Sequence, residues 1–139
     1  MTDRVFIDTN IIVYAHMIND PKKHETALAL LKNSLTGVRL WISTQILSEF
    51  YSAMSKNKYG HIEIVELMSE MTRNINVLPV MLSTVETALQ IKGVYQFSYW
   101  DSLMLAAALE SKCEVVYTED LQHKQVIEGK LAIVNPFLI

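Results

Sequence analysis

Apolar and polar positions divide the chain into two kinds of segment that follow one another. Short apolar runs, typical of strands buried on both faces, are separated by longer segments in which apolar side chains recur at helical spacing. The short runs are residues 4–7, 39–43, 76–80, 114–117 and 131–134 (RVFI, RLWIS, NVLPV, EVVY and LAIV). The helical pattern covers residues 21–34, 44–56, 62–73, 83–93 and 100–112.

Proline and glycine residues indicate where these segments begin and end. Pro21 stands at the start of the first helical segment, where its fixed φ angle and missing N–H are well tolerated. One apolar face of that segment consists of Ala27, Leu28, Leu31 and Leu35. Gly93 is expected to cap the helix over 83–93. Pro79 indicates that the third strand lies at a sheet edge, because proline cannot donate to a strand ladder.

The repetition of strand and helix predicts an α/β fold. Parallel strands joined by right-handed crossovers carry helices on both faces of the sheet. We expect a three-layer α/β/α sandwich with a mainly parallel sheet of about five strands, in a single domain over residues 1–139. In such sheets, ligands bind beyond the carboxyl ends of the strands, near the point where the strand order reverses.

Composition narrows the classes of function. Half of the 139 residues are hydrophobic, which excludes a disordered chain. The net charge of −3 does not suit a broad basic face for nucleic acid, so any such contact must use a local site or a partner protein. The single cysteine, Cys113, excludes an internal disulfide and indicates a reducing compartment. Without a membrane-length apolar stretch or a signal peptide, we expect a soluble cytoplasmic protein that does not enter a membrane.

Four acidic positions follow predicted strands or begin predicted helices. Asp8 ends the first strand, Glu49 lies on the helix after the second strand, and Asp101 begins the helix over 100–112. Asp120 follows the fourth strand, with Glu119 beside it. Each has an ordinary structural explanation when taken alone. Asp8 and Asp101 suit helix caps, Glu49 suits a solvated helix surface, and Asp120 suits an Asx turn.

Taken together, these positions favour a metal site. Separate strand–helix units each bring a carboxylate to the same edge of the sheet, where like charges repel. Burying such charges costs several kcal/mol unless a cation is present. Carboxylate oxygens without Cys or His ligands favour Mg²⁺, or Mn²⁺ as a substitute, over zinc.

Four motifs in order give the chain a family resemblance. FIDTNIIVYA, STQILSEF, FSYWDSLMLAAAL and VVYTEDLQH together resemble the PIN domain, and within it the VapC-like toxins of bacterial toxin–antitoxin pairs. The resemblance extends from about Val5 to Pro136. It implies a parallel α/β sandwich whose activity is the metal-dependent cleavage of RNA phosphodiester bonds.

The resemblance also implies which residues form the site. By position, the family's acidic ligands correspond to Asp8, Glu49 and Asp101, with Asp120 at a more variable fourth place. The family's polar residues beside these ligands correspond to Thr9, Asn10 and Thr118. Whether Glu119 or Asp120 faces the site is left open. One or two Mg²⁺ ions held there would lower the pKa of a bound water and neutralise charge on the phosphate.

The resemblance further implies partners, namely an RNA substrate, a second copy of the chain in a homodimer, and a cognate antitoxin protein. We expect the methionine-bearing helices between Gln45 and Arg73 to expose apolar surface for such contacts. The alternative is a catalytically inactive PIN-like scaffold that binds RNA or protein without cutting it. A receiver-type signalling domain is a poorer fit, because the third strand lacks an Asp and the fifth lacks a Lys.

Overall fold

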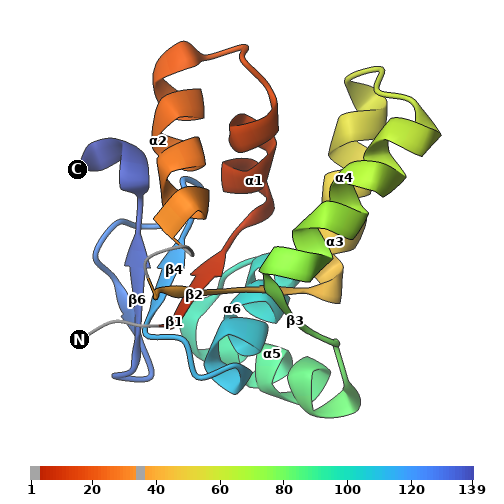
Figure 1. Cartoon of the computed structure of the whole chain (residues 1–139). Helices are drawn as coiled ribbons and strands as arrows, with labels where there is room; N and C mark the ends of the chain where they lie inside the picture. Colours follow the sequence, from red (N-terminus) through yellow and green to blue (C-terminus); the bar gives the residue numbers. More distant parts are fainter. Residues whose placement is uncertain (1–3, 34–36) are drawn as a thin grey trace.

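A mainly parallel β-sheet forms the centre of the protein (Figure 1). The computed structural model describes residues 4–33 and 37–139, and within these residues six strands form one sheet in the order β3-β2-β1-β4-β6-β5. The strands are β1 (Arg4–Ile7), β2 (Arg39–Ser43), β3 (Asn76–Leu78), β4 (Val115–Tyr117), β5 (Val126–Ile127) and β6 (Leu131–Val134). Only the short β5 runs antiparallel to its neighbour.

Helices cover both faces of this sheet, as the sequence predicts. They are α1 (Thr9–His16), α2 (Pro21–Lys32), α3 (Thr44–Lys56), α4 (His61–Asn74), α5 (Leu82–Tyr95), α6 (Tyr99–Glu110) and the 3₁₀ turn η2 (Pro136–Leu138). Figure 1 shows α1 to α4 on one side of the sheet and α5 with α6 on the other. This division follows from right-handed crossovers. The strands β1, β2 and β3 follow one another in one direction across the sheet, whereas β4 lies on the other side of β1, so the helices before and after this reversal cover opposite faces.

The strand order reverses between β1 and β4, the position where ligands bind in sheets of this kind. These two strands pair in parallel, with Ile7 opposite Tyr117. The next residue on each strand is Asp8 on one and Thr118 on the other, and both are buried. The register therefore brings two polar side chains together at the carboxyl edge of an otherwise apolar sheet.

The core explains why the central segments lack polar alternation. Val5, Phe6 and Ile7 of β1 are all buried, since helices cover both faces of this strand. Helix α6 is buried continuously from Ser102 to Ala108, because it lies between the sheet and α5. Each fully buried side chain of the size of Phe6 contributes about 1.5–3 kcal/mol to stability. The middle of α6 is thereby held firmly against the sheet.

Several boundaries differ from those expected. Helix α5 continues past Gly93 to Tyr95, and Gln96 caps it in the left-handed conformation at φ 64°. The prediction of Gly93 as the cap is therefore wrong, because α5 continues for two more residues and Tyr95 packs against the core. The β3 strand ends at Leu78, before Pro79, and lies at the sheet edge as predicted.

The remaining differences concern β5, the first helical segment and the methionines. The two residues of β5 are too few to give a strand pattern, and their turn uses Gly129 at φ 65°. Leu35, expected on the apolar face of α2, lies outside the described residues, as does Ser34. Met54 and Met71 are buried in the core, but Ile62 and Val65 on α4 are 73% and 42% exposed, so the helices between Gln45 and Arg73 expose apolar surface as expected, through residues other than these methionines. Within the described residues, no helix is long and apolar enough to cross a membrane.

Candidate active site

Asp8 is both a helix cap and a link between two strands. Its side chain is 7% exposed at the end of β1. Oδ1 accepts a 2.7 Å hydrogen bond from the backbone N–H of Thr9 at the start of α1, so the capping explanation is correct. Oδ2 accepts a 2.7 Å hydrogen bond from the hydroxyl of Thr118, beyond β4. Capping therefore accounts for only one of the two oxygens.

The first two residues of α1 connect Asp8 with two further carboxylates. The hydroxyl of Thr9 donates to Oε1 of Glu49 at 2.6 Å. The side-chain amide of Asn10 donates to Oδ2 of Asp120 at 2.9 Å and approaches Oδ2 of Asp8 at 3.5 Å. Carboxylates from β1, α3 and the segment after β4 thus converge on the N-terminus of one helix, where the helix dipole favours negative charge.

The electrostatics of Asp8 reflect this crowding. The pKa of Asp8 is raised from 3.8 to about 7, mainly by burial, with the negative charges of Asp120 and Glu49 contributing to the rise. Hydrogen bonds from Thr118 and from the backbone of Thr9 oppose the rise. A buried carboxylate with such a raised pKa is typical of a functional site, because its charged form needs a partner to be stable.

Asp101 has a different place in its helix from the expected cap. Ser98 caps α6, and its hydroxyl accepts from the backbone N–H of Asp101 at 3.1 Å. Asp101 is therefore the third residue of the helix, and its capping explanation is wrong. The side-chain amide of Gln45 donates to the carbonyl of Trp100 at 3.0 Å and to Oε2 of Glu49 at 3.2 Å. This amide connects the start of α6 to α3.

The two neighbouring acids after β4 point to different surroundings. Glu119 accepts a 2.6 Å hydrogen bond from the hydroxyl of Tyr14 and forms a 2.8 Å ion pair with Lys23. The Lys23 ammonium also lies 5.2 Å from the centre of the Phe137 ring. The hydrogen bond to Glu119 raises the pKa of Tyr14. Glu119 thus anchors the segment to α1 and α2, whereas Asp120 contacts Asn10 at the edge of the sheet.

Within residues 4–33 and 37–139, no three His, Cys, Asp or Glu side chains stand close enough to hold a metal ion. The joint binding of one metal by all four acids stays a prediction. Two side-chain oxygens nearby are nevertheless buried without a hydrogen-bond partner among the described residues, Oδ1 of Asn10 and Oε1 of Gln45. Their amide nitrogens already donate to carboxylates, which fixes the orientation of both amides.

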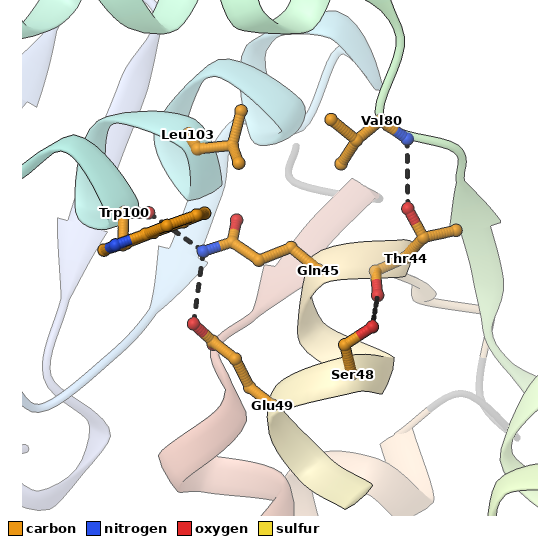
Figure 2. Close-up of a pocket in the computed structure, with 7 residues that line it drawn as sticks. All are labelled: Thr44, Gln45, Ser48, Glu49, Val80, Trp100 and Leu103. Carbon is orange, nitrogen blue, oxygen red and sulfur yellow. Dashed lines mark hydrogen bonds between the residues drawn. The ribbon is translucent and has the colours of Figure 1, made fainter. Parts of the chain in front are cut away.

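A pocket opens beside Glu49, between the start of α3 and the start of α6. Its volume is about 520 Å³, and it is lined by Thr44, Gln45, Ser48, Glu49, Val80, Trp100 and Leu103. Figure 2 shows the Gln45 amide between Trp100 and Glu49, with both of its hydrogen bonds drawn. One wall of the pocket is therefore an acidic residue of the site and another is a tryptophan.

The PIN-domain family profile matches residues 5–128 of the chain. The chain belongs to the PIN-domain family.

Solved structures agree with the fold of this PIN domain. VapBC2 of Rickettsia felis bound to a promoter DNA fragment has a TM-score of 0.68 at 16% identity, covering 95% of this chain and 99% of the other. The sarcin–ricin loop cleaving toxin VapC20 of Mycobacterium tuberculosis gives 0.68 at 18% identity, covering 84% and 91%. A toxin–antitoxin complex from Klebsiella pneumoniae gives 0.67 at 18% identity, covering 95% and 97%. No curated protein matches the chain significantly.

Some residues of the candidate site in this PIN domain were not found by sequence reasoning. Gln45 and Trp100 join α3 to α6. Tyr14 and Lys23 bind the side chain of Glu119, the neighbour of Asp120. The signal for Gln45 was its place four residues before Glu49, where side chains on a helix meet. Trp100 directly precedes Asp101. Tyr14 and Lys23 gave no local signal, because their partner Glu119 is distant in the sequence.

Proposed function

We propose that this PIN domain is a Mg²⁺-dependent endoribonuclease that hydrolyses RNA phosphodiester bonds, acting as the toxin of a toxin–antitoxin pair. The observation that carries the proposal is the buried Asp8 at the strand-order reversal, in electrostatic contact with Glu49 and Asp120. A structural cap needs no further carboxylates around it. A cation site needs them, because several negative oxygens bind a hard divalent ion.

The chemistry of the residues fits Mg²⁺ or Mn²⁺. The groups that contact Asp8, Glu49 and Asp120 are hydroxyls and amides, which offset their negative charge only in part. The unpartnered amide oxygens of Asn10 and Gln45 add neutral acceptors to the same region. Hard oxygen donors of this kind suit Mg²⁺ and Mn²⁺ better than softer metals.

In the proposed mechanism, Asp8, Glu49 and Asp101 would hold one or two Mg²⁺ ions, and Asp120 would complete the second site. When bound, Mg²⁺ would lower the pKa of a water molecule and neutralise charge on the phosphate and the leaving oxygen. The remaining work belongs to the side chains that orient these acids. Thr118 and Thr9 donate to Asp8 and Glu49, and Asn10 donates to Asp120, so each carboxylate is restrained in direction.

The toxin assignment is supported by the neighbouring folds. The Rickettsia felis and Klebsiella pneumoniae structures contain toxin–antitoxin proteins, and the Mycobacterium tuberculosis protein cleaves the sarcin–ricin loop. We infer a homodimer restrained by an antitoxin. Exposed apolar side chains suit such contacts, for example Ile62 on α4 and Leu82 on α5 at 73% and 74% exposure.

The test of catalysis is the cleavage of total RNA in Mg²⁺ and in EDTA. Asp8→Asn keeps a capping oxygen but removes the charge, so we expect it to fold and to lose cleavage by about a hundredfold or more. Asp20→Asn is the matched control, because Asp20 caps α2 by accepting from the backbone of Lys23. Full activity of Asp8→Asn, or equal activity in EDTA, would contradict the proposal.

The partner assignment has its own test. Light scattering at micromolar concentration should report a mass of twice 15.9 kDa. A co-expressed protein from the neighbouring reading frame should co-purify with the chain and suppress its cleavage of RNA. A clean monomer argues against the dimer, and a neighbour that never co-purifies argues against the antitoxin.

The second candidate function is a PIN-like scaffold that binds RNA or protein without cutting it. The observation that favours it is that no three metal-ligating side chains of the described residues are gathered closely enough to hold an ion. The same assay separates the two candidates. A scaffold would bind RNA equally in Mg²⁺ and EDTA and leave it intact, with no difference between Asp8→Asn and Asp20→Asn.

A further inference from the structure

We propose that the pocket between α3 and α6 binds one unstacked base of the RNA strand, with Trp100 as the stacking surface. The inference rests on the proposed ribonuclease function and names the part of the substrate that the chain recognises. Its starting point is that the pocket shares Glu49 with the candidate active site. A nucleotide next to the cleaved bond would therefore place its base in or near this pocket.

The exposure of Trp100 is the first supporting observation. The residue lies in the first turn of α6 and is 62% exposed, although the seven residues from Ser102 to Ala108 are buried. An indole ring that is this exposed makes few apolar contacts within the protein. Stacking against the flat π-face of a base would supply such contacts. Tyr99 packs edge-on against Trp100 with ring centres 5.1 Å apart, which steadies the indole.

The chain's net charge is the second observation. At −3, the protein gains little from general attraction to phosphates, so stacking on an aromatic side chain becomes a more important source of RNA affinity. Single-stranded RNA is recognised mainly by unstacked bases that lie against aromatic rings. The pocket volume of about 520 Å³ lies within the range of small-molecule sites and exceeds what a single base needs.

Polar groups on the α3 side can hydrogen-bond the edge of a base. The hydroxyl of Thr44 accepts a 3.1 Å hydrogen bond from the backbone N–H of Val80, which leaves its own hydrogen to donate. The hydroxyl of Ser48 donates to the carbonyl of Thr44 at 3.1 Å, which leaves its lone pairs to accept. Both residues are exposed. The pocket therefore offers a donor and an acceptor beside apolar walls from Val80 and Leu103.

Gln45 connects base binding to the candidate active site as a positioning residue. Its amide donates to Glu49 and to the backbone carbonyl of Trp100, so one side chain links the carboxylate to the backbone that carries the ring (Figure 2). Gln45→Leu should lower cleavage, because Glu49 loses one of its two restraining hydrogen bonds, and should also weaken base binding, because the bond to the Trp100 carbonyl is lost.

The experiment uses a 2′-O-methyl RNA tetranucleotide, which resists cleavage, added to the full chain in EDTA. The Trp41→Phe variant serves as the background, because its remaining tryptophan is Trp100. We expect saturable quenching of its fluorescence by the tetranucleotide and no quenching by an abasic tetramer with the same phosphates. Trp100→Ala should weaken binding of a labelled tetranucleotide by roughly tenfold. Leu89→Ala, which removes a similarly exposed apolar side chain from α5, should leave binding unchanged.

Each result supports or overturns the base site independently of catalysis. Equal quenching by intact and abasic tetramers, or no quenching, overturns it. Unchanged RNA affinity in Trp100→Ala with loss of a co-purifying antitoxin also overturns it and makes the pocket a protein-binding site. Failure of the wild-type chain to cut RNA in Mg²⁺ bears on the proposed function alone, since base-dependent binding is measured in EDTA.

Discussion

The hydroxyl of Thr118 donates a 2.7 Å hydrogen bond to the carboxylate of Asp8 and accepts a 3.2 Å hydrogen bond from the backbone N–H of Asp120. One buried side chain thus fixes the direction of Asp8 and the path of the segment that carries Asp120. Its donated bond favours the charged form of Asp8 and lowers the pKa that burial raises.

Replacing Thr118 by valine keeps the size of the side chain and removes both hydrogen bonds. We expect the pKa of Asp8 to rise above its wild-type value of about 7, because the bond that favours the carboxylate is lost. The measurement is an NMR titration of the Asp8 carboxyl carbon in metal-free protein. Thr118→Ser, which keeps a hydroxyl, should restore a value near that of the wild type. An unchanged titration in Thr118→Val would contradict the role given to this bond.

The stability of the metal-free protein should depend on pH through Asp8. Its pKa is raised from 3.8 to about 7, so the folded protein holds this proton more tightly than the unfolded chain does. The resulting stabilisation is complete below pH 3.8 and disappears as the pH rises through about 7. Thermal melts in EDTA should therefore show that the melting temperature of Asp8→Asn rises relative to that of wild type as the pH increases from 5 to 8.

That comparison cancels contributions from other titrating groups, because wild type and variant share them. Asp20→Asn is again the control, and its stability relative to wild type should not change over the same pH range. If the difference in melting temperature between Asp8→Asn and wild type is the same at pH 5 and at pH 8, Asp8 titrates normally.

Divalent cations should raise the melting temperature of the wild-type protein. An ion that binds the folded chain and not the unfolded chain stabilises it by mass action. Millimolar Mg²⁺ or Mn²⁺ should give this increase, and Asp101→Asn should remove most of it if Asp101 shares the ion with Asp8. Differential scanning fluorimetry with and without EDTA measures both. An identical response of the two proteins would exclude Asp101 from the metal site.

The roles of the two adjacent acids can be separated by paired amide substitutions. Asp120→Asn should lower RNA cleavage by roughly tenfold or more, since even residues that only support metal ligands matter by that amount. Glu119→Gln loses its ion pair with Lys23, and should lower stability only slightly because solvent screens this pair. We expect Glu119→Gln to keep most of the cleavage. The reverse order of activities would make Glu119 the acid that faces the site.

The sequence was informative where the physical cause is local or periodic. Unalternating apolar runs predicted buried parallel strands, and the residue after the β1 run, Asp8, was expected at the sheet edge where it lies. Helix α3 begins and ends as its pattern predicts. Gly93 misled because Tyr95, two residues later, still packs against the core as part of α5, and a non-glycine residue, Gln96, adopts the left-handed cap.

Contacts between segments that are distant in the sequence could not be predicted from the pattern of hydrophobic and polar residues. The adjacent residues Glu119 and Asp120 look equivalent in sequence, but Lys23 and Tyr14 select one and Asn10 the other. The pocket beside Glu49 depends likewise on how α6 packs against α3, which sets where Trp100 lies. Composition and spacing carry no information about such partners, because they become neighbours only once the sheet has formed.

The 110-residue separation between Asp8 and Thr118 has a consequence for synthesis on the ribosome. During translation Asp8 emerges long before β4 and the segment after it, so a nascent chain lacks the hydroxyl that orients this acid and lacks Asp120 altogether. Under the proposed function, the growing chain is surrounded by RNA that a finished enzyme could attack. The order of the strands therefore delays assembly of the candidate active site until the segment after β4 has been made.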